Sequence, residues 1–277
     1  MSRIEEAIRR VKGGVRETAA DGEQLFMPAW PVADEESSTP DPGPGSRLSV
    51  SSAWRDRLAT GTGGDPVLVE QFRRLAATLH HAHISRELRS IMVTSATPGD
   101  GKTLTALNLA FVLAESYGYR VLLVDADLRR PSISSIVDLA DGAGLSEALR
   151  APAAQKLALA RLTPRLTLLP AGQPTVNSIE VLVSQRMRMI LDEATAKFDW
   201  VILDAPPVGL TADARLLSHM VEGTLFVIRA AKTQHADVLR GIEAVGREQI
   251  LGVVLNDVEP RSTDAYYYAG TESGKKR

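Results

Sequence analysis

The sequence predicts an α/β fold in which a mostly parallel sheet carries helices on both faces. Two apolar runs that we expect to form strands, residues 121–124 and 201–203, are continuous rather than alternating, as in strands buried on both faces. From residue 66 onward such runs alternate with segments of helical periodicity, which is typical of parallel sheets. A loop containing two glycines, residues 95–103, follows one strand and opens a helix.

The composition narrows the class of protein. The chain has 277 residues, a formal net charge of -2 and 44% hydrophobic residues, enough for a sizeable core. The absence of cysteine excludes disulfides, thiolate metal sites and thiol nucleophiles. No apolar run reaches the roughly 18 residues of a membrane span, and the charged N-terminus lacks a signal-peptide core. The near-neutral net charge gives no electrostatic reason to expect nucleic acid as the main partner. Because no membrane span is predicted, we expect a cytoplasmic protein that reaches a membrane only through a partner.

The chain divides into four predicted parts. Residues 1–14 have the pattern of a short amphipathic helix, which either frays or docks on a partner. Residues 15–65 have the composition of a disordered linker, with a loosely attached strand around residues 48–50. Residues 66–259 form the predicted α/β domain. Residues 260–277 form a polar, flexible tail that contains tyrosines.

Hydrophobic periodicity places the elements of the domain along the chain. A helix at the start of the domain precedes the first strand, and strands and helices then alternate to residue 255. The expected elements are helix 67–80, strand 89–95, helix 102–117, strand 120–125, a helical stretch after Pro131, short helix 145–149, strand 166–169, helix 178–197, strand 200–204, helix 211–219, strand 224–229, helix 235–247 and strand 250–255.

The loop after the first strand has the pattern of a phosphate-binding loop (P-loop). Backbone N–H groups at a helix start cradle phosphates, and the helix dipole favours their negative charge. We expect Lys102 to reach the outer phosphates of ATP and the Thr103 hydroxyl to hold Mg²⁺. The alternative, a glycine-rich turn before an ordinary helix, fits the flanking strand and helix less well. The candidate ATP-binding residues of this loop are Thr97, Pro98, Gly99, Asp100, Gly101, Lys102, Thr103 and Leu104.

Carboxylates follow two of the apolar strands. Asp125 and Asp127 end one run, and Asp204 ends another. Ligands of a parallel sheet lie beyond the carboxyl ends of its strands, so Asp125 and Asp127 should lie near the P-loop if their strand is a neighbour of the strand before the loop. Asp204 has the position of a Walker B carboxylate, which holds Mg²⁺ directly or through water. Each alone is equally well a helix-capping residue.

These residues have defined expected roles in phosphoryl transfer. Asp125 and Asp204 are candidate Mg²⁺ ligands, and Asp127 is the candidate acceptor of the nucleophile's proton. With Lys102 these three form the predicted catalytic set. Arg129 either contacts phosphate or forms a salt bridge that orients the aspartates.

Taken together, these motifs resemble the bacterial tyrosine kinases (BY-kinases) over about residues 66–270. The P-loop follows that family's S-x-x-P-G-x-G-K-[ST] pattern, residues 122–129 match its apolar run before D-x-D-x-R, and residues 201–204 match its Walker B strand. The resemblance implies a MinD-like P-loop NTPase fold and ATP-dependent protein-tyrosine kinase activity. The related ParA and MinD ATPases carry a signature lysine where this chain has Thr97. Asn256 resembles the position that meets the nucleotide base, although a turn-forming asparagine would look the same.

The resemblance also indicates acceptors and self-association. Three of the five tyrosines, Tyr266, Tyr267 and Tyr268, are consecutive in the tail and correspond to the family's autophosphorylated cluster. The alternative is an aromatic clasp packed on the domain. Glu70 and Arg73 match the first two positions of the family's E-x-x-R-x-x-R oligomer motif, but Ala76 replaces the last arginine. These residues otherwise belong to a solvated helix face.

The biological setting follows from resemblance alone. We expect a homo-oligomer that works with a separately encoded transmembrane polysaccharide co-polymerase as activator, in exopolysaccharide polymerisation and export. The first seven residues resemble autokinases of exosortase-type loci, and residues 172–182 resemble a family stretch in which Ser178 takes the place of a proline. Two other functions stay open: a ParA/MinD-like ATPase switch, and a non-catalytic nucleotide-binding adaptor.

Overall fold

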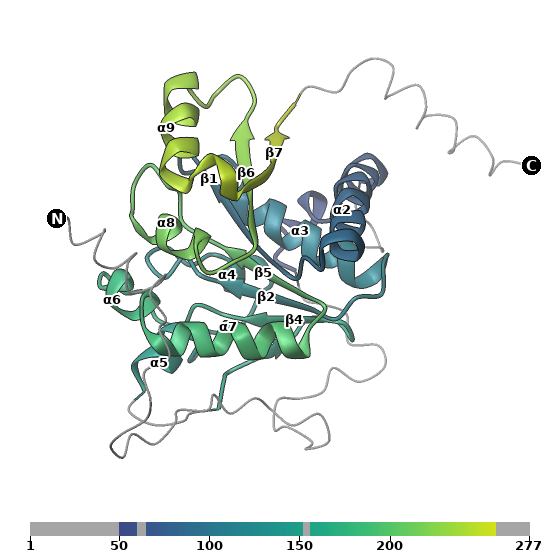
Figure 1. The fold of residues 1–277 in the computed structure, drawn as a ribbon. Helices are drawn as coiled ribbons and strands as arrows, with labels where there is room; N and C mark the ends of the chain where they lie inside the picture. The colour runs from purple at the N-terminus through teal and green to yellow at the C-terminus, as the bar shows by residue number, and fades with distance from the viewer. Residues whose placement is uncertain (1–49, 60–64, 152–155, 259–277) are drawn as a thin grey trace, which may run out of the picture.

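A computed structural model describes residues 50–59, 65–151 and 156–258. These residues form a seven-stranded sheet of order β3-β4-β2-β5-β1-β6-β7 (Figure 1). Neighbouring strands are parallel except for β3, which runs antiparallel to β4 at one edge. The strands are β1 (Ser90–Ser95), β2 (Val121–Asp125), β3 (Ala160–Arg161), β4 (Leu166–Leu169), β5 (Trp200–Asp204), β6 (Gly223–Arg229) and β7 (Ile250–Asn256).

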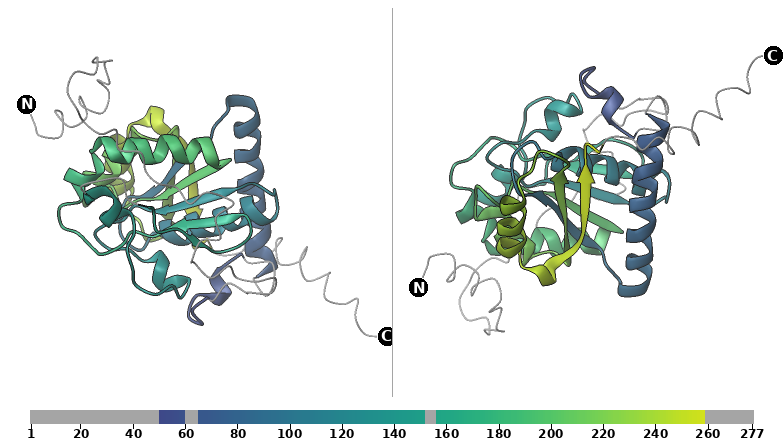
Figure 2. Two further views of the ribbon diagram at one scale, coloured as in Figure 1. Left: turned by 90° about the horizontal axis from the view of Figure 1, so that it is seen from below. Right: turned by 90° about the horizontal axis from the view of Figure 1, so that it is seen from above.

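Helices cover both faces of this sheet, and Figure 2 shows α2 and α7 on opposite sides of it. Alternate residues of β5 feed two cores: Ile202 packs in the cluster that contains α2 and α3, and Val201 packs in the one that contains α7 and α8. The predicted two-sided α/β fold is confirmed. The helices are η1 (Arg55–Arg57, 3₁₀), α2 (Pro66–Arg86), α3 (Lys102–Glu115), α4 (Ile133–Ile136), α5 (Leu145–Arg150), α6 (Ser178–Leu182), α7 (Gln185–Lys197), α8 (Asp213–Ser218), α9 (His235–Val245) and η2 (Arg247–Gln249, 3₁₀).

Several predicted boundaries differ from the structure. The helix expected over 178–197 is two helices, because the Ser184 hydroxyl caps a new helix by accepting a hydrogen bond from Met187 N at 3.3 Å. α2 continues to Arg86 and ends at Glu87, whose φ of 54° is left-handed. The two-residue strand β3 was not predicted, since a run that short carries no periodicity. Val50, part of the expected strand 48–50, lies in no strand.

Part of the predicted linker packs on the domain. The Asn108 side chain on α3 accepts a hydrogen bond from Ala59 N at 2.6 Å and donates one to Arg57 O at 2.9 Å. Ser51 N donates to Ile136 O at 3.1 Å, and Leu58 is fully buried. The prediction of a disordered linker is therefore wrong for residues 50–59. The cause is a buried asparagine on a distant helix, which composition cannot reveal.

Some predictions concern residues outside the described ranges. The expected N-terminal helix of residues 1–14 and the tail with Tyr266, Tyr267 and Tyr268 both lie there. Within the described ranges, none of the helices combines the length and apolar character that crossing a bilayer requires.

Candidate active site

The strand order brings the predicted carboxylates to one edge of the sheet. β2 and β5 are neighbours, and their register places Asp125 directly opposite Asp204. β5 also pairs with β1, whose carboxyl end leads into the P-loop. Since all three strands are parallel, their carboxyl ends meet beside the start of α3. β1 and β2 are not neighbours, which the expectation for Asp125 and Asp127 had required, and the segments come together because β5 lies between them.

The P-loop needs glycine at two positions with left-handed backbone, Gly99 (φ 85°) and Gly101 (φ 101°). At Gly101 the need is also steric, because a Cβ there would lie 2.0 Å from Asn256 Nδ2. That nitrogen donates a hydrogen bond to Asp100 O at 2.8 Å. Asn256, at the end of β7, therefore holds the P-loop in place.

The side chains of Thr97 and Asp100 brace the loop from within. The Asp100 carboxylate, 3% exposed, accepts hydrogen bonds from Thr97 N and Thr97 Oγ1, both at 2.9 Å, and from Thr233 Oγ1 at 2.8 Å. These contacts engage both side chains, so a phosphate would meet the backbone of this stretch rather than the Asp100 carboxylate.

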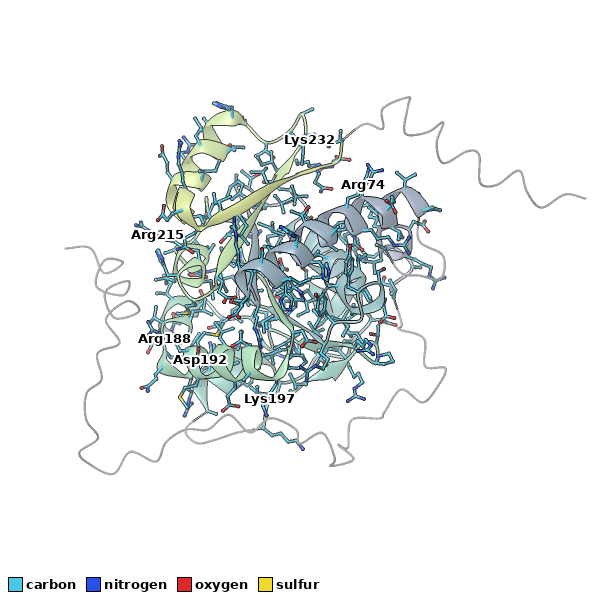
Figure 3. The ribbon with its side chains drawn as sticks, turned by 45° about the vertical axis from the view of Figure 1, so that its right-hand side comes forward. Arg74, Arg188, Asp192, Lys197, Arg215 and Lys232 are labelled. Carbon is cyan, nitrogen blue, oxygen red and sulfur yellow. The ribbon has the colours of Figure 1, made fainter. Side chains whose placement is uncertain are left out.

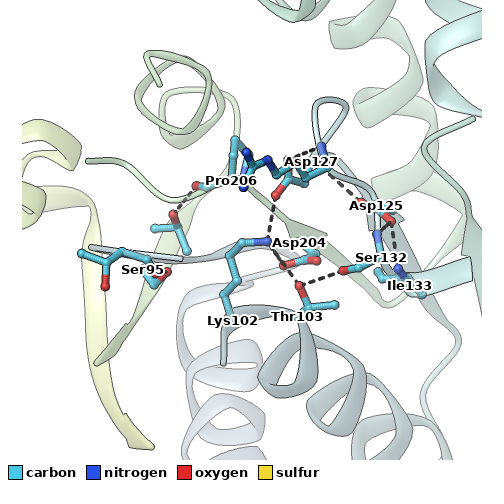
Figure 4. A network of polar contacts seen from close by, with 12 residues as sticks. Ser95, Lys102, Thr103, Asp125, Asp127, Ser132, Ile133, Asp204 and Pro206 are labelled. Atoms are coloured by element: carbon cyan, nitrogen blue, oxygen red, sulfur yellow. Dashed lines mark hydrogen bonds and ion pairs between the residues drawn. The ribbon is translucent and has the colours of Figure 1, made fainter. Parts of the chain in front are cut away.

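Lys102 lies among carboxylates in the cluster shown in Figure 4. Its Nζ atom is 3.0 Å from Asp127 Oδ2 and 3.5 Å from Asp204 Oδ1, and it donates a hydrogen bond to Thr103 Oγ1 at 3.2 Å. Burial alone would lower the pKa of Lys102, but the carboxylates of Asp204 and Asp127 outweigh it and raise the pKa above its usual value. The ammonium is therefore charged throughout the physiological pH range.

Asp204 is the carboxylate of the cluster with the fewest hydrogen-bond partners. It is completely buried, and neither carboxylate oxygen accepts a well-formed hydrogen bond from a described residue, although Lys102 and Thr103 lie nearby. Burial raises its pKa. A buried carboxylate with open lone pairs is costly unless a cation completes its environment. Together with the Thr103 hydroxyl, these oxygens are ligands of the kind that Mg²⁺ takes, so the donor set fits the ion.

Asp125 is engaged differently. Its Oδ1 accepts a hydrogen bond from Asp127 N at 3.3 Å, and its Oδ2 accepts from Ser132 N at 3.3 Å and Ile133 N at 3.2 Å. Burial, followed by the neighbouring Asp204 charge, raises its pKa to about 8. Asp125 thus anchors the loop of residues 126–132, which carries Asp127, and it has fewer free lone pairs for a metal than Asp204.

A pocket of about 980 Å³ opens above this cluster. Asp125 and Asp204 lie buried beneath it, whereas the remaining predicted residues of the loop and strand ends line it, apart from Thr97 and Asp100. The predicted residues that line the pocket are Pro98, Gly99, Gly101, Lys102, Thr103, Leu104, Asp127, Arg129 and Asn256.

Sequence reasoning missed several lining residues. Trp54 and Arg57, from the segment assigned to the linker, form part of the wall, with the Arg57 Cζ atom 5.4 Å from the centre of the Trp54 ring. Phe72 of α2 lies on the same wall. Ser132 Oγ is 3.5 Å from Thr103 Oγ1. For Trp54 and Arg57, the available signal in the sequence was a tryptophan followed by arginines in a stretch of otherwise small or polar residues.

Two predicted residues lie on the outer surface of α2. Arg73 Nη1 is 4.0 Å from Glu70 Oε2, and Arg74 Nε is 3.7 Å from Glu70 Oε1. Figure 3 shows Arg74 on α2 pointing outward, whereas Ala76 is fully buried. The third position of the expected oligomer motif therefore faces the core, so an arginine would not fit there without moving the helix.

Comparisons with known proteins agree with this geometry. Residues 91–276 match the model of the CobQ/CobB/MinD/ParA nucleotide binding domain. The tyrosine-protein kinase YwqD of Bacillus subtilis (strain 168) is 35% identical over 206 residues, which are 73% of this chain and 86% of that protein.

Solved structures give the same result. The kinase domain of the Escherichia coli tyrosine kinase ETK superposes with a TM-score of 0.63 at 29% identity, covering 70% of this chain and 78% of that one. MinD of Pyrococcus horikoshii OT3, at 21% identity and a TM-score of 0.52 over 64% of this chain and 76% of that one, shares the fold. With the motifs assembled at one sheet edge, these matches show that the chain carries a nucleotide-binding domain of the MinD/ParA type and belongs to the bacterial tyrosine-protein kinase family.

Proposed function

We propose that this protein is an ATP- and Mg²⁺-dependent protein-tyrosine autokinase whose active site is the cluster around Lys102. One observation carries the proposal: at the P-loop pocket, Lys102 Nζ lies 3.0 Å from Asp127 Oδ2 and 3.5 Å from Asp204 Oδ1. Membership of the tyrosine-kinase family supports the same reaction.

The reaction joins the acceptor to the γ-phosphate. The tyrosine oxygen forms a bond to the γ-phosphorus, the bond from that phosphorus to the β–γ bridging oxygen breaks, and ADP leaves. The tyrosine proton passes to the Asp127 carboxylate, and the Lys102 ammonium would neutralise charge on the β- and γ-phosphates. Thr103 and Asp204 would hold Mg²⁺, which would supply charge neutralisation for the phosphates. Asp125 maintains the loop that positions Asp127.

The P-loop contacts favour this function over an ATPase switch of the ParA/MinD type. In those ATPases the position of Thr97 carries the signature lysine. Here the Thr97 N–H and hydroxyl both bind the Asp100 carboxylate within the same loop. The residue at this position is thus committed to bracing its own loop.

We further propose that the acceptors are Tyr266, Tyr267 and Tyr268 of a neighbouring copy, with the copies meeting through α2 at Glu70 and Arg73. A separately encoded transmembrane polysaccharide co-polymerase would activate the protein at the cytoplasmic side of the membrane and link it to exopolysaccharide export. The consecutive tyrosines in the sequence and the exposure of Arg73 support these steps.

Phosphopeptide mapping tests the proposal directly. Purified full-length chain is incubated with ATP and Mg²⁺, alone and with a candidate activator, beside the Lys102→Met variant. Phosphate on the tail tyrosines of the wild type, and none on the variant, is the expected result. Mixing wild type with Lys102→Met should place phosphate on the variant's tail if transfer occurs between copies.

Three matched outcomes separate the candidate functions. A chain with all three tail tyrosines changed to phenylalanine should still release ADP in the presence of an acceptor peptide. ADP release by the wild type without any phosphotyrosine would instead indicate an ATPase switch. Nucleotide binding without ADP release would indicate an adaptor.

A further inference from the structure

Arg129 is held at the pocket by a residue far away in the chain. Its Nε donates a hydrogen bond to Asp213 Oδ2 at 2.9 Å, and Asp213 is only 1% exposed. The Arg129 side chain forms its ion pair with Asp213 rather than with Asp125, Asp127 or Asp204, so this ion pair does not orient those aspartates. It connects the loop after β2 to the first residue of α8 instead.

A third side chain fixes this ion pair. The Ser178 hydroxyl, fully buried at the start of α6, donates a hydrogen bond to the same Asp213 oxygen at 2.6 Å. Ser178 is the first residue of α6, a position at which many residue types, proline included, can start a helix. The helix itself therefore does not require a serine there. The Ser178 hydroxyl and Arg129 Nε both bind the same oxygen, Oδ2, of the buried Asp213 carboxylate.

The surrounding backbone strengthens the connection. Thr175 N donates a hydrogen bond to Leu128 O at 2.8 Å, and Arg150 donates to the Thr175 hydroxyl. The segment before α6 is thus tied to the residue that precedes Arg129. Arg129 is therefore held at two places, through the backbone of the residue before it and through its own Nε.

The free end of the guanidinium lies at the pocket. Arg129 and Asp127 both line the pocket above Lys102, and the Arg129 side chain is 34% exposed. With Nε engaged by Asp213, the Nη1 and Nη2 groups make no hydrogen bond to any described residue. An arginine whose remaining fork faces an anion site is suited to bind two oxygens of one phosphoryl group.

We propose that Asp213, fixed by Ser178, is a positioning residue that aims Arg129 at the phosphoryl group while it is being transferred. Arg129 then makes its strongest contact with the charge on the equatorial oxygens in the transition state, and a weaker one with bound ADP. Asp213 and Ser178 act only through Arg129. This rests on the proposed phosphoryl transfer, because Arg129 needs a migrating phosphoryl group to contact.

Binding of a transition-state analogue tests the inference without any turnover. Calorimetry would compare MgADP with aluminium fluoride, which mimics the migrating phosphoryl group, against MgADP alone. For Asp213→Asn we expect affinity for the analogue to fall about tenfold, with affinity for MgADP unchanged. A wild type that binds the analogue but forms no phosphotyrosine would defeat the proposed function and still test this inference.

Variants of the pair separate positioning from folding. Arg129→Met leaves Asp213 buried without its cation, so it should lower both the melting temperature and the affinity for the analogue. Adding Asp213→Asn to it removes that buried charge and should restore the melting temperature, but not the affinity. Effects of the two changes on analogue affinity should not multiply, because both act through one guanidinium.

Ser178→Ala is the mild variant, useful if Asp213→Asn does not fold. It should weaken analogue binding by about threefold and leave MgADP binding intact, as a small loss of positioning would. Wild-type analogue affinity in both Asp213→Asn and Ser178→Ala would overturn the inference. So would a double variant whose loss equals the product of the two single losses.

Discussion

The strand pair β2 and β5 has acidic residues at both ends, and Asp199 at one end and Asp204 at the other differ in how their carboxylates are hydrogen-bonded. At the amino end, Asp199 accepts hydrogen bonds from Arg120 N at 2.8 Å and Arg120 Nη2 at 2.9 Å. At the carboxyl end, Asp204 is fully buried and its oxygens accept no well-formed hydrogen bond from a described residue. Asp125, at the carboxyl end of β2, also accepts backbone hydrogen bonds, so Asp204 is the one carboxylate of these three whose oxygens stay open.

The neighbouring pair repeats the satisfied arrangement. Before β6, the Glu222 carboxylate accepts hydrogen bonds from Arg89 N at 2.6 Å and Ser90 N at 2.7 Å, at the start of β1. At the amino edge, acidic side chains complete backbone hydrogen bonding where strands begin, which stabilises the fold. At the carboxyl edge, the Asp204 oxygens stay without such hydrogen bonds, and the proposed Mg²⁺ would complete their environment. Among Asp199, Glu222 and Asp204, the open carboxylate is the one that lies beside Lys102.

The largest effect should come from removing the central cation. Lys102→Met should reduce phosphotransfer by about 10²- to 10³-fold, because the charge that meets the outer phosphates is lost. It should also lower the melting temperature, since Asp127 and Asp204 lose their shared partner. Tyrosine phosphorylation and thermal denaturation measure the two effects. Wild-type activity in this variant would show that Lys102 and the carboxylates around it are not the catalytic site.

Asp204→Asn should change activity and stability in opposite directions. We expect phosphotransfer to fall about 10²-fold as Mg²⁺ affinity weakens, since an amide is a poor replacement for the carboxylate. The free energy of unfolding without nucleotide should rise by about 1 kcal/mol or more, because a buried charge with open lone pairs is removed. Magnesium titration and urea unfolding test both. A loss of stability would show that Asp204 is a structural residue like those at the amino edge.

Glu222→Gln is the matched change at the other edge. It should lower the free energy of unfolding by about 1.5 kcal/mol, as charge-assisted hydrogen bonds to Arg89 N and Ser90 N weaken. Phosphotransfer should be unchanged, because Glu222 lies at the amino ends of the strands. Urea unfolding beside an activity assay checks this pair of outcomes, and reduced activity at equal folding would contradict the division between the edges.

The smallest effect concerns Asp199 and pH. Partial burial alone would raise the pKa of Asp199, but the hydrogen bonds from Arg120 together outweigh it and lower the pKa below its usual value. A lowered folded-state pKa adds stability above the unfolded value near 3.9, and this stability is lost as the pH falls through the folded pKa.

Asp199→Asn should therefore cost under about 1 kcal/mol at neutral pH, since the ion pair is partly exposed. The difference from wild type should vanish at low pH. Urea unfolding of both proteins between neutral pH and pH 3 measures it. A difference that grows on acidification would mean that Asp199 is held in its protonated form.

Local patterns account for the parts of the site that were predicted. The strand, glycine-rich loop and helix around Lys102 are contiguous, and Asp125 and Asp204 directly follow apolar strands. A parallel sheet places these ends on one edge, but their convergence depended on strand order, and only the structure shows that β5 lies between β1 and β2. Three residues were beyond such reasoning. Asp213 lies 84 residues from its partner Arg129, and Trp54 and Arg57 lie in a stretch of linker-like composition.

The sequence by itself determined the α/β fold, the P-loop and the carboxylates at strand ends, because each depends on periodicity or short spacing. Only the tertiary structure decided which carboxylate oxygens stay open, that Asn108 anchors residues 50–59, and that Ser178 and Asp213 hold Arg129. The physical reason is that hydrogen-bond satisfaction and burial depend on atoms from elements far apart in the chain, which no local pattern specifies.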